Sequence, residues 1–334
     1  MPKELTHWVL AEKTLENMDP SVLKESIARY KQVYYIGAVV LDSPFYNLFS
    51  RDDATPRLGK KLHKQSEVNL FQRFAHILQH FDFSPPDSFW AFLAGVITHI
   101  HADQTFHPVI FYFCGKDNTN DERARAYETR HRKLESFLDL HYFGDIRLIN
   151  HGRLSISLKQ MKIDHQTLRK YTGLLYFENE LRATKADNAL TRHARIQNLF
   201  QKRPVKNFLA LINRIPGIDL SSTLSLFYPA YKKIVSPFFK DAIVYYHPVN
   251  GAVRGESIAD LEKKTIAKNC NLFIELERHL NTAALKDILL SVKPASLETG
   301  LPPAEDNMMK HFDLSKSIEC LLGLSETACR RPEG

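Results

Sequence analysis

The stretch that most constrains the fold of this chain is apolar and runs from Phe89 to Tyr112, FWAFLAGVITHIHADQTFHPVIFY. It is apolar on most sides, as expected of a helix in a protein core, yet it carries His99, Asp103 and His107 at steps of four residues. Residues four apart lie on the same face of a helix, with Cβ atoms about 5–6 Å apart. An unpaired carboxylate is costly to bury, and imidazoles that are mostly uncharged at neutral pH suit a metal site better than a salt bridge. The spacing therefore indicates metal ligands.

The series is too long for a single ion. His99 and His107 are separated by about 12 Å along the helix axis at about 1.5 Å per residue, whereas metal–nitrogen bonds are about 2 Å long. Asp103 lies midway between them and can share an ion with either histidine. The sequence therefore predicts at least two metal ions.

A second helical run, from about residue 123 to 141, follows the turn-forming segment GKDNTND and carries His131 and Glu135, again four apart. In an antiparallel helical hairpin, residues equidistant from the turn lie side by side. His107 with His131, and Asp103 with Glu135, are both centred on position 119. The hairpin is therefore expected to bring His107, His131 and Glu135 together as a site of two histidines and one glutamate.

In order and spacing, these residues resemble the zinc-dependent phospholipase C family, which is all-helical and related to bacterial phosphatidylcholine-hydrolysing phospholipase C and single-strand-specific zinc nucleases. The family pattern is an early histidine, an aspartate in a GAVVxD-like segment, a lone histidine, a His-x3-Asp pair with a further histidine, and a His-x3-Glu pair. The match covers about the first 140 residues. The matching residues are His7, Asp42 in GAVVLDSPFY, His63, His99, Asp103, His107, His131 and Glu135.

The resemblance implies two sets of zinc ligands. The first set is Asp42, His63, His99 and Asp103, and the second is His107, His131 and Glu135. The second set has only three protein ligands, which leaves a position for water or substrate. Asp42 is expected either to bind zinc or to activate the water. In the family, the early histidine, here His7, helps to hold a third zinc with the shared aspartate and the amine of the mature N-terminal residue. Six residues precede His7, so two zinc ions are expected and the third is left open.

The resemblance also implies a phosphodiester hydrolase. Bound zinc lowers the pKa of water and neutralises charge on the nonbridging oxygens of a phosphodiester. The expected reaction is cleavage of a phospholipid headgroup, with peripheral contact to a membrane surface. One alternative is a zinc nuclease or other phosphoesterase, for which nucleic acid or another phosphodiester is the substrate. The other is a metal-stabilised lipid-binding or scaffold protein without turnover.

Other histidine positions have more ordinary explanations. His76 and His80 lie one turn apart, but they lack an acidic partner at matching spacing. His101 is displaced by about 200° from the first histidine of the central series, at roughly 100° per residue, and is expected to face another element. For His63 a surface position is the alternative to a ligand, and for His7 it is packing or helix capping.

Composition and periodicity predict an all-α protein. The chain has 334 residues and 44% hydrophobic content, which is normal for a globular protein with a substantial core. Helical periods recur and no two-residue alternation persists, so a multi-helix bundle with a metal cluster between helices is expected. We predict one domain over residues 1–290 and a partly extended tail over 291–334, with a boundary near residue 150 as the alternative.

Three predictions concern the second half of the chain. The segment HPVNGAVRGES is expected to be a loop, and a helix that begins near Ser257, with Asp260 in its first turn, is expected to pack back on the metal-bearing bundle. The segment SVKPASLETGLPPAEDN is expected to be a linker or an extended surface piece. A short helix is expected at residues 313–323.

The charge pattern favours a weakly basic surface over a nucleic-acid groove. The net charge is +7, but the Lys and Arg residues are spread along the chain without a dense basic tract interleaved with aromatics. No apolar run of about 20 residues is free of polar residues. The N-terminal MPKELTHWVL lacks the pattern of a secretory signal, and the four cysteines form no CxxC motif. A soluble protein in the cytoplasm is expected.

Overall fold

The computed structural model describes residues 3–46, 54–65, 68–82, 84–116, 122–143, 152–177, 183–229, 236–280, 282–302 and 309–324. The helices of the first half are α1 (Glu4–Asn17), α2 (Val22–Arg29), α3 (Lys31–Val40), the 3-10 helix η1 (Ser43–Tyr46), α4 (Ala54–Lys64), α5 (Leu70–Gln79), α6 (Asp87–Cys114), α7 (Glu122–Phe143) and α9 (Leu154–Gln160). Those of the second half are α10 (His165–Phe177), α11 (Ala183–Phe200), α12 (Arg203–Ile212), α13 (Ser221–Leu224), α14 (Pro237–Lys240), α15 (Ile258–Arg278), α16 (Ala284–Ser291) and α17 (Ile318–Leu321). The two strands, β1 (Ile243–Tyr246) and β2 (Val253–Glu256), pair antiparallel. The prediction of an all-α bundle is confirmed.

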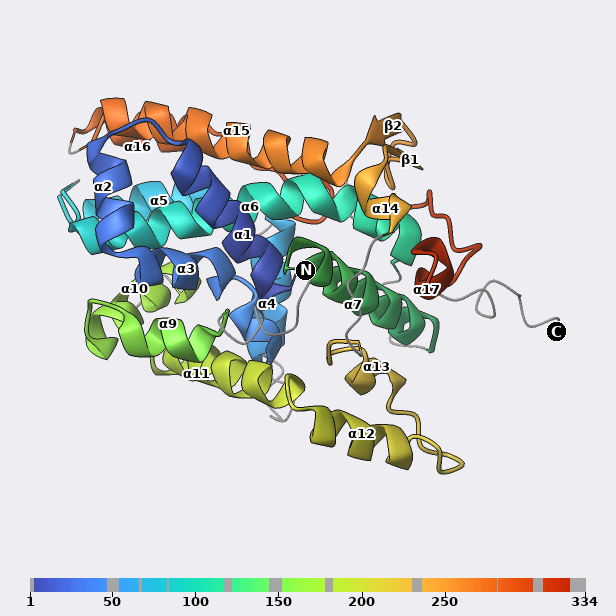
Figure 1. Ribbon diagram of the computed structural model, residues 1–334. Coiled ribbons are helices and arrows are strands. Elements are labelled where there is room, and N and C mark those ends of the chain that lie inside the picture. Colours follow the sequence, from blue (N-terminus) through green and yellow to red (C-terminus); the bar gives the residue numbers. More distant parts are fainter. Residues whose placement is uncertain are drawn as a thin grey trace.

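Helix α6 runs through the middle of the molecule and is buried along most of its length (Figure 1). It crosses α3 at a pair of glycines. A Cβ atom on Gly37 would lie 2.3 Å from the carbonyl oxygen of Phe92, and one on Gly95 would lie 2.1 Å from that of Tyr34. Larger residues would therefore force the helices apart. This close crossing brings the end of α3, and Asp42 just beyond it, to the part of α6 that carries the histidines.

The predicted helices agree with the structure in their main features. The run expected at 89–112 is α6, Asp87–Cys114, and the run expected at 123–141 is α7, Glu122–Phe143. The helix expected near Ser257 is α15, where the side chains of Ser257 and Asp260 form a reciprocal capping box. Helix α15 packs against α1 and α6, as expected.

Three expectations for the second half were wrong in part. The segment expected to be a loop contains strand β2, which pairs with β1. Strand β1 shows no alternation of polar and apolar residues in the sequence. Ile243 and Tyr245 point inward, but Val244 and Tyr246, which point outward, are apolar as well. The segment expected on the surface buries Ser296, Leu297 and Thr299. The short C-terminal helix, α17, covers only Ile318–Leu321.

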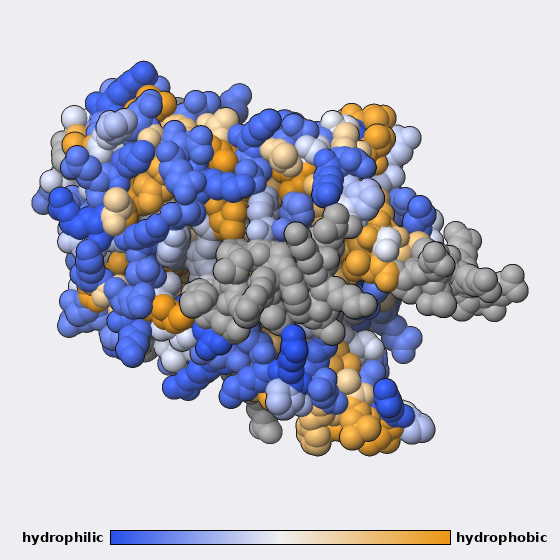
Figure 2. All heavy atoms as spheres, in the orientation of Figure 1, coloured by the Kyte–Doolittle hydropathy of each residue, from blue (hydrophilic) through white to orange (hydrophobic). Residues whose placement is uncertain are grey.

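The surface seen in Figure 2 is largely polar, with apolar side chains gathered at the lower right, over α12, and at the upper right, over the β1–β2 hairpin. Exposed apolar residues on these elements include Phe208 and Leu211 on α12, and Val244 and Val253 on the hairpin. Within the described ranges, none of the helices combines the length and the hydropathy that a bilayer span requires.

Candidate metal centre

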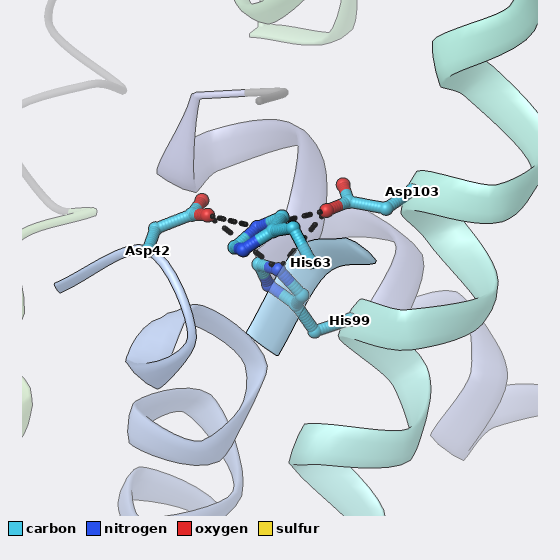
Figure 3. Close-up of side chains that lie close together, drawn as sticks. All are labelled: Asp42, His63, His99 and Asp103. Carbon is cyan, nitrogen blue, oxygen red and sulfur yellow. Dashed lines mark hydrogen bonds and ion pairs between the residues drawn. The ribbon is translucent and has the colours of Figure 1, made fainter. Parts of the chain in front are cut away.

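The first predicted ligand set converges at the centre of the bundle (Figure 3). Asp42 follows α3, His63 lies near the end of α4, and His99 and Asp103 lie one turn apart on α6. All four residues are buried. Their side chains point toward one another from three separate segments of the chain.

The spacing of the four ligand atoms fits one tetrahedral ion. Asp42 Oδ1 lies 3.1 Å from His63 Nε2 and 3.6 Å from His99 Nε2. Asp103 Oδ2 lies 3.4 Å from His63 Nε2 and 3.2 Å from His99 Nε2. Ligand atoms held at about 2.0–2.1 Å from a tetrahedral ion are about 3.3–3.4 Å apart. The residues therefore fit a bound zinc ion with little rearrangement.

Backbone carbonyls fix the orientation of the imidazoles. The Nδ1 atoms of the histidines lie 2.8 Å from Gly59 O for His63, 2.8 Å from Ala38 O for His99 and 2.6 Å from Leu297 O for His107. A histidine that donates from Nδ1 to a carbonyl presents Nε2 to the centre, which is the usual arrangement of a metal-binding imidazole. Sequence patterns of side chains do not reveal these carbonyl partners.

The second predicted set lies between α6 and α7. His131 Nε2 lies 2.7 Å from Glu135 Oε1, which is 3.9 Å from His107 Nε2. The side chain of His131 is 13% exposed, more than those of His107 and Glu135, which are 2% and 4% exposed. This set therefore lies nearer to solvent, and its three ligands leave room for another.

Asp103 connects the two sets and reaches the third predicted position. Its Oδ1 lies 3.7 Å from His107 Nε2 and 3.4 Å from His7 Nε2. His7, in α1, is fully buried and stacks on His99 with ring centroids 4.0 Å apart. The structure thus places His7 beside the centre but outside the two compact groups. The N-terminal amine, the other ligand implied for a third zinc, lies outside the described residues.

Buried polar atoms in the centre lack hydrogen-bond partners. They are His7 Nδ1 and Nε2, His99 Nε2, both carboxylate oxygens of Asp103, and His107 Nε2. Such atoms are rare in protein interiors because losing hydration without a replacement partner is costly. A metal ion bound between His99 and Asp103, and another at His107, would satisfy most of them.

The pKa shifts show how charge is balanced before a metal binds. Burial alone would raise the pKa of Asp42 and of Asp103, but neighbouring imidazoles hold both below their usual value. Burial alone would lower the pKa of His63, but these two carboxylates raise it. In the second set, burial raises the pKa of Glu135 to about 8 and holds that of His107 well below its usual value. A divalent cation would replace the imidazole protons as the balancing charge in the first set and the proton of Glu135 in the second.

The three histidines with more ordinary explanations, His76, His80 and His101, lie outside the two ligand groups. His101 faces α15, where its Nδ1 lies 2.8 Å from Asn269 Oδ1, as predicted for a histidine that faces another element. His76 and His80 stack edge to face on the exposed side of α5. Neither belongs to a candidate metal group among the residues that the structure describes.

The sequence did not predict that a C-terminal segment, residues 295–301, lies across the centre. Besides the contact with His107, the backbone N–H of Leu297 donates to His63 O at 2.9 Å. Gln104 Nε2 donates to Ala295 O at 3.0 Å, and His247 Nε2 lies 2.9 Å from Thr299 O. We call residues 295–301 the strap. These contacts are made by its backbone, which leaves no motif in the sequence, and the Glu298 side chain adds an ion pair with Lys116.

Comparison with known proteins agrees with the geometry. A family model described as zinc dependent phospholipase C matches residues 6–199, which is more than half of the chain and includes all eight predicted ligands. Neither the curated proteins nor the solved structures contain a match. The chain therefore belongs to the zinc-dependent phospholipase C family.

Proposed function

We propose that this protein hydrolyses phosphodiesters with zinc and that its substrate is a phospholipid, whose headgroup it cleaves. The proposal rests on the tetrahedral spacing of the atoms supplied by Asp42, His63, His99 and Asp103. Their buried donors, two carboxylates and two imidazoles, suit zinc. The second set, His107, His131 and Glu135, would hold a further zinc ion. When bound, zinc supplies an acidic water and positive charge for the phosphoryl oxygens.

Asp103 and Asp42 would have the remaining roles, which are to bind the two ions and to accept a proton. Asp103 would contribute one oxygen to each set, because Oδ2 faces His63 and His99 while Oδ1 faces His107. Asp42 would bind through Oδ1, and its Oδ2 would accept the proton of the attacking water. This assignment gives Asp42 both of its expected roles, one on each oxygen. The side of the centre at His131, which is nearer to solvent, is where a substrate phosphate would approach.

Substituting Asp103 with asparagine tests this proposal. We expect two zinc ions per wild-type chain, one for each ligand group, and loss of zinc from the Asp103→Asn variant because a neutral amide replaces a shared anionic ligand. Phospholipid hydrolysis should fall by at least about a hundredfold, since losing even a residue that only hydrogen-bonds to a metal ligand costs about 10–100-fold. The measurements are zinc content by mass spectrometry and hydrolysis of phosphatidylcholine, phosphatidylethanolamine and single-stranded DNA.

Asp87→Asn is the matched control, because Asp87 begins the same helix and pairs with Arg29 on the surface. It should keep its zinc and its activity. Full activity in Asp103→Asn, or a wild-type protein that takes up no zinc on refolding with zinc, would refute the proposed centre. Hydrolysis of DNA without hydrolysis of phospholipids would assign the centre to a nuclease, and zinc uptake without any hydrolysis would leave a metal-stabilised binding protein.

A further inference from the structure

Helix α12 exposes apolar side chains to solvent. Val205 and Leu209 on one side pack inward against a small core cluster. A different side, where a surface helix normally carries polar residues, continues with large apolar residues into the following turn. We call these residues the apolar ridge: Phe208, Leu211, Ile215 and Ile218, which are 62%, 62%, 52% and 39% exposed. Eleven large hydrophobic residues are exposed in the described part of the chain, and these four of them lie together within residues 208–218.

The ridge lies on a projecting part of the molecule, and the turn that ends it is closed by a hydrogen bond. Helix α12 extends away from the body at the lower right of Figure 1, and the same region is apolar in Figure 2. The side chain of Asn213 accepts a hydrogen bond from the backbone N–H of Leu220, which closes the turn. Gly217, at φ +84°, allows the tight backbone conformation at its tip. The apolar side chains are therefore presented on a convex, preformed element.

Basic residues border the ridge. Lys202, Arg203 and Arg214 are exposed, and no carboxylate in the described ranges forms an ion pair with them. Asp219 is the only acidic residue between positions 202 and 219. Apolar side chains flanked by exposed cations are typical of an element that lies in a membrane interface, where the cations meet anionic headgroups.

We propose that the apolar ridge docks the protein on an anionic phospholipid surface. A second copy of the chain is a poorer occupant, because pairing two ridges would bring the same basic residues together. A convex tip also suits insertion among lipid headgroups. The choice of a phospholipid surface rests on the proposed function, but docking is measured without hydrolysis, so the two proposals can fail separately.

The experiment compares vesicle binding by wild-type protein and by the triple variant Phe208→Ser/Leu211→Ser/Ile215→Ser. The vesicles are phosphatidylcholine alone and phosphatidylcholine mixed with phosphatidylserine, and binding is measured by co-sedimentation. Wild-type protein should prefer the mixed vesicles, and the triple variant should bind them at least about tenfold more weakly, because three side chains lose their apolar burial. Its turnover of a soluble short-chain phospholipid should be unchanged, since none of the three residues lies in the metal centre.

The matched control is Val22→Ser/Ile274→Ser/Leu290→Ser, three exposed apolar residues on α2, α15 and α16, at 61%, 42% and 44% exposure. This variant should bind vesicles like the wild type. Charge reversal of Lys202, Arg203 and Arg214 to glutamate should remove the preference for phosphatidylserine.

Two results would overturn the docking proposal. One is equal vesicle binding by the wild type and the ridge variant, or no binding by either. The other is a wild-type dimer that the ridge substitutions dissociate, which would assign the ridge to a second copy. Vesicle binding without hydrolysis would support the docking proposal and refute the proposed phospholipase activity. Hydrolysis of soluble phospholipid without vesicle binding would support the activity and refute the docking proposal.

Discussion

Glu4 is a buried carboxylate that lies outside the metal centre, and neighbouring side chains stabilise it. Its Oε1 lies 2.7 Å from His193 Nε2 and also accepts a hydrogen bond from the hydroxyl of Tyr46. Burial alone would raise the pKa of Glu4, but these donors lower it to about 2. The other ring nitrogen of His193 lies 2.9 Å from the hydroxyl of Ser43, the neighbour of Asp42 in sequence. This chain of contacts ties α1 and α11 to the turn that presents Asp42.

We predict that Glu4→Gln weakens the acid dependence of stability. The pKa of Glu4 is about 2 in the folded protein and 4.5 in its unperturbed state, so between these values the unfolded chain binds the proton more strongly. The contribution of Glu4 is therefore complete above the unfolded value and is lost as the pH falls toward the folded one. It amounts to roughly 3 kcal/mol, since one pKa unit corresponds to about 1.4 kcal/mol.

The measurement is the free energy of unfolding by urea across this acidic range, with a chelator present so that zinc release does not contribute. Wild-type stability should fall more steeply than that of Glu4→Gln. Glu25→Gln, at an exposed position on α2, serves as the control and should follow the wild type. Parallel curves for wild type and Glu4→Gln would contradict the assigned role of the pair with His193.

The strap docks where one backbone hydrogen bond is missing from the continuous helix α6. Pro108 lies inside α6 and has no N–H, so it cannot donate to the carbonyl of Gln104 four residues earlier. Gly300 packs against this carbonyl, since a Cβ atom at position 300 would lie 2.6 Å from Gln104 O. The contact places Leu297 within reach of His107. The missing hydrogen bond at the proline of α6 and the glycine of the strap therefore position His107, a predicted zinc ligand.

We predict that Gly300→Ala loosens the strap and weakens zinc binding. The added Cβ would clash with a backbone atom that has little freedom to move, and the residue would also keep a left-handed backbone, at φ +68°. Gly217→Ala is the control, because Gly217 is also left-handed, at φ +84°, but a Cβ atom added there would meet no other atom within 4 Å. The control should lose only about 1–2 kcal/mol from backbone strain.

Urea unfolding and zinc competition by a chelator measure the two effects. Gly300→Ala should lose more stability than Gly217→Ala and release zinc at a lower chelator concentration. Equal losses in the two variants, with zinc affinity unchanged in both, would show that the strap does not position His107.

The sequence predicted the helices that carry the candidate ligands better than it predicted the segments that position those ligands through backbone contacts. Steps of four residues on α6 and α7 were enough to bring His107, His131 and Glu135 together, because helix geometry fixes such spacings. The inclusion of His63, from the separate helix α4, depended on resemblance to the family. The strap and the contact of His193 with Glu4 join residues more than 180 positions apart, and no local pattern encodes them.

At the scale of the whole molecule, the two candidate ligand sets join helices from separate parts of the chain. The first set links the segment after α3 with α4 and α6, and the second links α6 with α7. Their carboxylates, Asp42, Asp103 and Glu135, are all buried. Bound zinc would stabilise the folded chain by an amount that rises with the logarithm of its affinity for that state over the unfolded one.

We therefore predict that a chelator lowers the melting temperature of the zinc-loaded protein by roughly 5–15 °C, as expected for the loss of a few kcal/mol of binding energy. Calorimetry with and without the chelator measures the shift. Asp103→Asn should already melt near the chelated wild type and respond little, because it lacks the shared ligand, whereas Asp87→Asn should respond fully. If the wild type melted at the same temperature with and without chelator, protons on the imidazoles and on Glu135 would suffice to balance the buried carboxylates, and the helices would hold their arrangement without zinc.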